Sequence, residues 1–179
     1  SRVCPHEALC QGACVMVKNG DPVLTGYLES FVMDFAREMG LIKIPVGEPT
    51  GKKIAIVGAG PAGLGCAEQL VQIGHTVTIF ESKPEAGGLL VYGIPNFKLP
   101  KEVVNYRIRD LLDAGVEFVF NTYIGKDKTI DQLLEEGYDA VFVGVGTQVD
   151  APLKVEGANL SGVYPATEFL IRTNVRDHY

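Results

Sequence analysis

A glycine-rich stretch with the spacing G-x-G-x-x-G spans residues 58–63 and could hold the pyrophosphate of a dinucleotide. It follows an apolar, strand-like segment and opens a helix-like one, which is the setting that this spacing needs. Gly58 would allow the tight turn, Gly60 would let the backbone approach the phosphates, and Gly63 would let helix and strand pack closely. The predicted loop residues are Gly58, Ala59, Gly60, Pro61, Ala62 and Gly63.

An acidic residue, Glu81, ends the next apolar segment, 18 residues after Gly63. This is close to the spacing of about 20 residues expected for a carboxylate that accepts hydrogen bonds from the adenosine ribose. Glu81 alone does not distinguish FAD from NAD. Further glycine-rich segments favour FAD, because they offer a long cofactor more backbone contact. They are Gly87 with Gly88, and the strand end 144–147, in which Gly146 and Thr147 are predicted contacts.

Three of the four cysteines, Cys4, Cys10 and Cys14, could form a disulfide, a zinc site or part of an iron–sulfur site. The N-terminus shows no secretory signal, so the expected location is cytoplasmic, where disulfides are rare. A structural zinc site would need paired C-x₂-C ligands or a spaced histidine, which this pattern lacks. The Cys4-Pro5 pair is typical of the end of a ferredoxin ligand run. The fourth cysteine, Cys66, is predicted to be a core thiol.

The composition excludes several classes of function. The chain has 179 residues, 46% of them hydrophobic, and a formal net charge of −6 from 16 basic and 22 acidic residues. Because it has no Lys/Arg run, this acidic chain is poorly suited to bind nucleic acid. Its longest uncharged stretch, residues 54–67, is too short to span a bilayer. We therefore expect a soluble protein with no nucleic-acid or membrane partner.

Strand-like and helix-like segments alternate from residue 53 onward, which predicts an α/β fold with a doubly wound parallel sheet. The predicted strand segments are 53–60, which runs into the glycine loop, 75–81, 116–120, and 138–147, which ends in glycine again. The predicted helices are 61–73, 101–114, 130–136 and a short one within 162–174. Before them, Tyr27, Phe31 and Phe35 recur every four positions and predict an amphipathic helix closed by Gly40. The predicted domains are a partial helical iron–sulfur-type segment over 1–40, a linker over 41–52, and an FAD-binding Rossmann-like domain over 53–179, incomplete at its C-terminus.

Five segments carry a resemblance to a known family. They are RVCPHEALCQGAC, TGYLESF, KIAIVGAGPAGLGCAEQL, FESKPEAGGLLVYGIPNFKLPK and YDAVFVGVGT, and they cover nearly the whole chain in one order. The sequence resembles the glutamate synthase small-subunit family of flavoproteins. This group also includes the flavin subunit of NADH-dependent ferredoxin:NADP⁺ oxidoreductases and the N-terminal half of dihydropyrimidine dehydrogenase.

The resemblance implies an electron-transfer module in which NAD(P)H gives hydride to FAD and electrons pass singly to 4Fe–4S clusters. The cofactors carry such a reaction, so no catalytic side chain is predicted, and His6, His75 and His178 have no partner at motif spacing. The implied FAD contacts match residues 58–62, then Glu81, Ser82 and the positions on to Gly87, Gly88 and Leu89, together with Lys98 and Ile124. The implied cluster ligands match Cys4, Cys10 and Cys14, distributed over two clusters, and Glu29.

Two parts of the family pattern are missing from this sequence. The first block of cluster cysteines is absent, so neither cluster has its full ligand set here, and the NAD(P)H-binding domain is absent too. We therefore expect a fragment whose partner is a larger subunit or the rest of its own polypeptide, with an electron acceptor beyond it. Two alternatives stay open: an NAD-binding dehydrogenase domain with a zinc site, and a cofactor-poor piece that only binds a partner.

Overall fold

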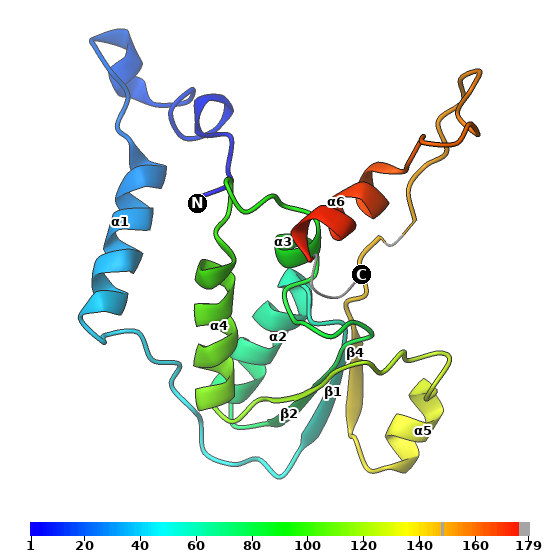
Figure 1. Ribbon diagram of the computed structural model, residues 1–179. Helices are drawn as coiled ribbons and strands as arrows, with labels where there is room; N and C mark the ends of the chain where they lie inside the picture. The colour runs from blue at the N-terminus through cyan, green and yellow to red at the C-terminus, as the bar shows by residue number, and fades with distance from the viewer. Residues whose placement is uncertain (148, 176–179) are drawn as a thin grey trace. The chain divides into compact units, whose positions relative to one another are not determined.

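The computed structural model describes residues 1–147 and 149–175, so His178 lies outside the described part of the chain. Two compact units follow each other along the chain, Ser1–Lys43 and a second one that begins at Ile44 (Figure 1). Among the described residues, no helix combines the length and the apolar character that crossing a membrane requires.

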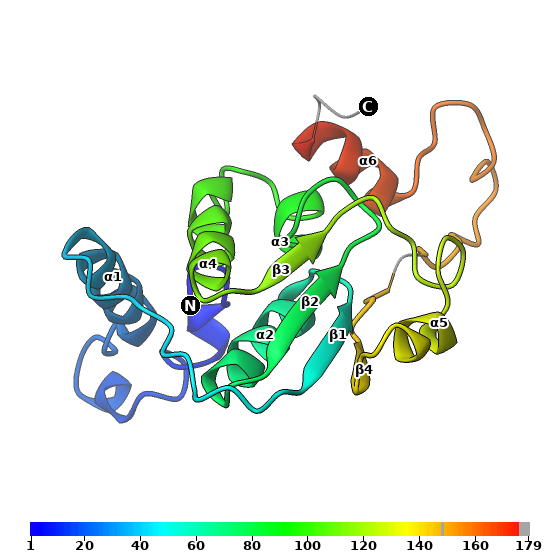
Figure 2. The ribbon, with the colours of Figure 1, turned by 90° about the horizontal axis from the view of Figure 1, so that it is seen from below.

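The second unit, as described, is built on a sheet of four parallel strands in the order β3-β2-β1-β4 (Figure 2). The strands are β1 (Lys53–Val57), β2 (Thr76–Phe80), β3 (Glu117–Val119) and β4 (Ala140–Val143). The chain runs outward from β1 to β2 and β3, then returns to the other side of β1 for β4. This reversal places a switch point between the carboxyl ends of β1 and β4, where open α/β sheets bind ligands. The predicted α/β fold with a parallel sheet is confirmed.

Helices follow the strands along the chain of this unit. They are α2 (Pro61–Gln72), α3 (Leu89–Tyr92), α4 (Lys101–Asp113), α5 (Ile130–Glu135) and α6 (Ala166–Asn174). At the start of α5 a capping box forms, in which Thr129 Oγ1 accepts from Gln132 N and Gln132 Oε1 accepts from Thr129 N. Four of these helices lie where the sequence predicts them. α3 is not predicted, because four residues are too few to show a helical period.

The two faces of the sheet carry separate parts of the core, because side chains alternate along each strand. One face packs under α2 and α4, and its buried residues include Ile56, Val77 and Ile79 from the strands, Leu64, Ala67 and Val71 from α2, and Leu111 from α4 (Figure 1). The opposite face packs on α5 through Ala55, Val57, Phe80 and Leu133. β1 is thus buried on both faces, which gives the loop that follows it a rigid base.

Asp139 ties the start of β1 to the start of β4, at the opposite end of these strands from the glycine loop. Its Oδ1 accepts from Lys52 Nζ at 2.7 Å, and its Oδ2 accepts from Lys53 N at 2.8 Å. The Lys52 ammonium, and next the Lys53 amide, lower the pKa of the Asp139 carboxyl. Such a carboxyl stabilises the folded state above its ordinary pKa of about 3.9, and this stabilisation is lost as the pH falls through the lowered value.

We expect Asp139→Asn to lower the free energy of unfolding slightly at neutral pH, because the pair is exposed and water screens it. The difference from the unchanged protein should persist down to about pH 5 and vanish on strong acidification, when the Asp139 carboxyl is protonated. Urea unfolding of both proteins across this pH range measures the difference. A difference that stays constant into strong acid would contradict the lowered pKa.

The first unit contains two 3₁₀ helices, His6–Ala8 and Val15–Lys18, followed by α1 (Thr25–Glu38). His6 is buried, with Nε2 2.7 Å from the Ser1 carbonyl oxygen and its ring edge-on to Tyr27. A Cβ at Gly26 would lie 2.2 Å from that ring, so glycine at this position lets α1 approach His6. His6 is therefore a packing residue that joins the N-terminal turn to α1.

The apolar stripe predicted for α1 is present, but it is exposed. Phe31 and Tyr27 are 65% and 61% exposed, and Gly26 is the buried residue of this helix. The rings of Phe31 and Phe35 stack on each other with their centroids 6.2 Å apart. The stripe therefore contributes little to the core of the described part of the chain.

Candidate functional site: a glycine-lined edge and a cysteine segment

The glycine loop after β1 lies at the switch point between β1 and β4. Gly58 has a φ of +102°, which L residues rarely adopt, and a Cβ there would lie 2.6 Å from Gly144 O. A Cβ at Gly63 would lie 1.9 Å from Gly58 O. Both glycines are therefore needed by the packing of the protein itself, which brings the start of α2 and the segment after β4 close to this turn.

Gly60 differs from these two, because the protein leaves room for a side chain there. Its φ of −77° and ψ of −178° are open to any residue. Among the described residues, a Cβ would meet only Gly88 Cα, at 3.9 Å. This space is a cradle at the N-terminus of α2, whose first turn holds no acidic residue and whose backbone N–H groups favour an anion. The cradle fits a pyrophosphate, which a side chain at Gly60 would displace.

The Glu81 carboxylate is buried at the end of β2 and joins two loops. Its Oε2 accepts from Ala59 N at 2.8 Å. Its Oε1 accepts from Lys83 N at 2.9 Å and from Ser82 Oγ at 3.1 Å. A carboxylate can accept about four hydrogen bonds, so these contacts leave capacity for one more donor, such as a ribose hydroxyl. Glu81 therefore also holds the glycine loop, a role that its spacing in the sequence does not reveal.

The second glycine pair docks directly on the first loop. Gly87 N donates to Ala59 O at 2.8 Å. The φ angles of Gly87 and Gly88, +122° and +51°, are conformations that favour glycine. A Cβ at Gly88 would lie 2.8 Å from Gly60 Cα. The two glycine segments thus form one continuous backbone edge, of the kind that a long cofactor needs.

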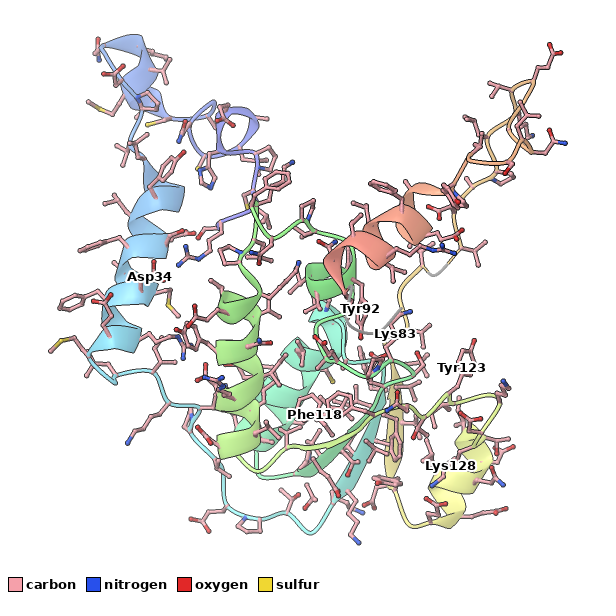
Figure 3. All side chains as sticks on the ribbon, viewed as in Figure 1. Asp34, Lys83, Tyr92, Phe118, Tyr123 and Lys128 are labelled. Carbon is pink, nitrogen blue, oxygen red and sulfur yellow. The ribbon has the colours of Figure 1, made fainter. Side chains whose placement is uncertain are left out.

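Tyr92 fixes α3 and the loop before it, and the sequence does not single this residue out. Its hydroxyl accepts from Glu85 N at 3.0 Å and donates to Glu85 O at 3.2 Å. Lys83 Nζ lies 5.1 Å from the centre of the Tyr92 ring (Figure 3). Asn174 Nδ2, from α6, donates to the Tyr92 carbonyl at 3.0 Å. No spacing rule would find Tyr92, because the partner in α6 is 82 positions away.

Three other predicted FAD contacts follow the ends of β2 and β3. Ser82 bonds to Glu81, and Leu89 begins α3 immediately after the second glycine pair. Ile124 comes two residues after Thr122, whose N donates to Glu81 O at 2.9 Å. The Ile124 side chain packs with the core cluster that contains Leu133 of α5, and Ile124 forms an isolated parallel bridge with Lys128.

The remaining predicted contacts are more exposed. Gly146 and Thr147 follow β4, and the same segment begins at Gly144, where a Cβ would lie 3.6 Å from Ala62 Cβ. Lys98 is exposed in the turn before α4, where its N donates to Pro95 O at 2.9 Å. Backbone and side-chain contacts therefore join residues 58–63, 81–82 and 87–88 into one edge, whereas Lys98 lies in the turn before α4.

The predicted cluster ligands do not form one ligand set in this structure. Cys4 is exposed, Cys10 and Cys14 are partly exposed, and all three are free thiols. Within the described residues, no three His, Cys, Asp or Glu side chains gather as a metal site. Glu29 is exposed on α1. The thiols have the chemistry that iron–sulfur ligation needs, and the assembled geometry would require further ligands.

The pKa values of two cysteine thiols are shifted in opposite directions. Val23 N donates to Cys14 Sγ at 3.5 Å, and this bond, followed by that from the Met16 backbone, lowers the pKa of the Cys14 thiol. Burial raises the pKa of the thiol of Cys66, which lies in α2 and packs against the core. Cys14 is therefore the more easily ionised thiol, and the thiolate is the form that binds metals.

Two families match the chain, one for each unit. Residues 1–41 match the family described as dihydropyrimidine dehydrogenase domain II, 4Fe-4S cluster. Residues 56–113 match the family described as NAD(P)-binding Rossmann-like domain, which covers the glycine loop, Glu81 and the second glycine pair.

Relatives match along nearly the whole chain. The glutamate synthase [NADPH] small chain of Escherichia coli K12 is 46% identical over 171 residues, which are 95% of this chain and 36% of that protein. The small chain of Bacillus subtilis 168 is 46% identical over 170 residues, covering 94% and 34%. The putative oxidoreductase AegA of E. coli K12 is 43% identical over 173 residues, covering 95% and 26%. The chain thus spans about a third of the length of the small chains that it matches.

Solved structures support the same relationship. Mycobacterium tuberculosis FprA in complex with NADPH superposes with a TM-score of 0.60 at 28% identity, covering 70% of this chain and 29% of that one. A 2-naphthoyl-CoA reductase complex superposes with a TM-score of 0.57 at 28% identity, covering 72% and 19%. The resemblance seen in the sequence is therefore confirmed, and the chain is a relative of the glutamate synthase small chains and of the oxidoreductases that group with them.

Proposed function

We propose that this chain is the FAD- and 4Fe–4S-binding electron-transfer module of an NAD(P)H-dependent oxidoreductase. When bound, FAD would take a hydride from NAD(P)H and release electrons singly, which is the form that iron–sulfur clusters accept. The residues of this chain bind and orient the cofactors, and none is assigned a proton-transfer role. The proposed partners are NAD(P)H, an electron acceptor, and a larger subunit or the rest of the polypeptide.

The cradle at Gly60 is the observation that carries the proposal. Packing explains glycine at Gly58 and Gly63, but within the described residues it does not explain glycine at Gly60. A ligand that lies against the backbone would explain it, and the helix N-terminus favours a phosphate there. Glu81 retains one acceptor site for a ribose hydroxyl beside the same loop.

The second glycine pair favours FAD over NAD. Gly88 lies against Gly60, so the backbone edge continues past the pyrophosphate cradle toward α3. A cofactor that extends beyond its pyrophosphate along this edge would use both segments. NAD is the second candidate, because the family that matches residues 56–113 is described as NAD(P)-binding.

The cysteine segment supports cluster binding by the first unit. Residues 1–41 match a family whose description names a 4Fe-4S cluster. We propose that Cys4, Cys10 and Cys14, with Glu29, supply part of the ligands of two clusters and that the other ligands come from elsewhere in the protein.

The cofactor content of a single purified sample distinguishes the candidate functions. The protein as the cell makes it is purified without oxygen, and its flavin, NAD, iron, acid-labile sulfide and zinc are measured. FAD together with iron and sulfide is the expected result. Bound NAD with zinc would overturn the proposal in favour of a dehydrogenase domain, and a protein that carries none of these would indicate a piece that only binds a partner.

Replacement of a single predicted ligand should separate the two cofactors. We expect Cys14→Ser to lower the iron and sulfide content by about one cluster and to leave FAD in place, because the thiolate ligand is lost from the first unit only. The matched control is Cys66→Ala, which removes a partly buried thiol of α2 that packs against the core and should change neither content. Equal iron in the Cys14→Ser protein and the unchanged protein would show that Cys14 is not a ligand.

A further inference from the structure

Lys101, the first residue of α4, reaches back to α3 and closes the segment between them. Its Nζ donates to Leu90 O at 3.0 Å and also to Ile94 O. Its backbone N donates to Asn96 Oδ1 at 3.0 Å. Lys101 thus bonds to one residue of α3, Leu90, and to two residues of the segment that follows α3, Ile94 and Asn96.

This ammonium is unusual because lysine side chains normally extend into water. Lys101 is only partly exposed, and burial lowers its pKa. The last carbonyl groups of a helix have no partner within the helix, and α3 is only four residues long. Lys101 provides donors for Leu90 O in α3 and for Ile94 O just beyond it, which offsets the cost of its own desolvation.

The N-terminal end of α3 is attached to the proposed cofactor edge, so the position of α3 affects the position of the second glycine pair. α3 begins directly after Gly88, whose backbone lies against Gly60. The preceding residue, Gly87, is bonded to Ala59 O. The segment is therefore fixed to the glycine loop at one end and to Lys101 at the other. Only the four-residue helix α3 and the residues next to it lie between these two attachments.

We propose that Lys101 is a positioning residue that keeps the second glycine pair in the conformation needed to bind FAD. This inference rests on the proposed function. By holding α3, Lys101 keeps the glycine edge formed before the cofactor arrives, so binding does not have to order this segment. Lys101 does not need to touch the cofactor for this role.

Three variants test the role in the full protein. Lys101→Met keeps the aliphatic stem and removes the donors, Lys101→Arg keeps a charged donor group, and Lys154→Met removes an exposed lysine elsewhere in the unit. Amide hydrogen exchange of residues 85–98 and the dissociation constant of FAD are measured for each. We expect Lys101→Met to speed exchange in this segment but not in β1 or β2, and to weaken FAD binding about tenfold. Lys101→Arg should restore much of both, and Lys154→Met should change neither.

Three other results would contradict either the positioning role of Lys101 or the proposed cofactor. Unchanged exchange and unchanged FAD affinity in Lys101→Met would overturn the positioning role. Faster exchange throughout the unit, β1 and β2 included, would also overturn it, because Lys101 would then support the fold in general. Faster exchange confined to residues 85–98, in a protein whose unchanged form binds no FAD, would uphold the anchoring of α3 and refute the proposed cofactor.

Discussion

Gly60→Val is expected to leave the fold intact and to abolish FAD retention. The backbone angles at Gly60 suit any residue, and a Cβ there would meet only Gly88 Cα within 4 Å among the described atoms, so the start of a side chain fits without displacing the protein. The added side chain would fill the cradle that the pyrophosphate is proposed to occupy. We expect FAD binding to weaken by at least about 100-fold, which corresponds to roughly 3 kcal/mol.

The measurement compares bound flavin with stability in the same samples. The flavin content of the purified protein and its urea midpoint are determined for the unchanged protein, Gly60→Ala and Gly60→Val. Loss of flavin should increase with side-chain size while the urea midpoint of the flavin-free forms stays constant. Full flavin in Gly60→Val would refute the placement of the pyrophosphate, and a lower midpoint would show that this glycine serves the fold instead.

Gly63→Ala is expected to have the opposite effect, because it damages the fold rather than an open cradle. A Cβ at Gly63 would lie 1.9 Å from Gly58 O and 3.2 Å from Ile56 Cγ2. Because the clashing atom, Gly58 O, belongs to the backbone, it cannot move without a large cost in free energy, and α2 would have to shift away from β1. We expect the free energy of unfolding to fall by about 3 kcal/mol, at the upper end of the usual cost of overpacking.

Gly65→Ala is the matched control in the same helix. A Cβ at Gly65 would meet no described atom within 4 Å, so alanine should stabilise α2 by about 0.5–1 kcal/mol through its better helix propensity. Urea unfolding of both flavin-free variants measures the contrast. Similar stabilities for Gly63→Ala and Gly65→Ala would contradict the close approach of α2 to Gly58.

Much of the fold could be predicted from local patterns in the sequence. Apolar segments separated by glycine and proline predict the strands and most helices, and their alternation predicts a parallel sheet. The strand segments 53–60 and 138–147 are predicted to run into glycine. In the structure β1 ends at Val57, directly before Gly58 with its positive φ, and β4 ends at Val143, directly before Gly144.

The candidate site could be predicted only where it depends on spacing. The positions of the glycine loop and of Glu81 follow from the motif. The contact of His6 with Gly26 and the bonds from Lys101 to α3 follow from no periodicity, because each joins residues through the folded chain. The arrangement of the three N-terminal thiols was also beyond the sequence, since a shared metal site depends on where separate turns meet.

The bonds of Glu81 have a consequence for attempts to redesign cofactor preference. The residue at the end of β2 is an obvious position to change, because its carboxylate would select the adenosine ribose. In this chain the same carboxylate also holds Ala59 N and Lys83 N. Exchanging it for a neutral or basic residue would therefore remove the tether between the two loops together with the selectivity. Any redesign has to supply a new acceptor for Ala59 N before it can choose a new dinucleotide.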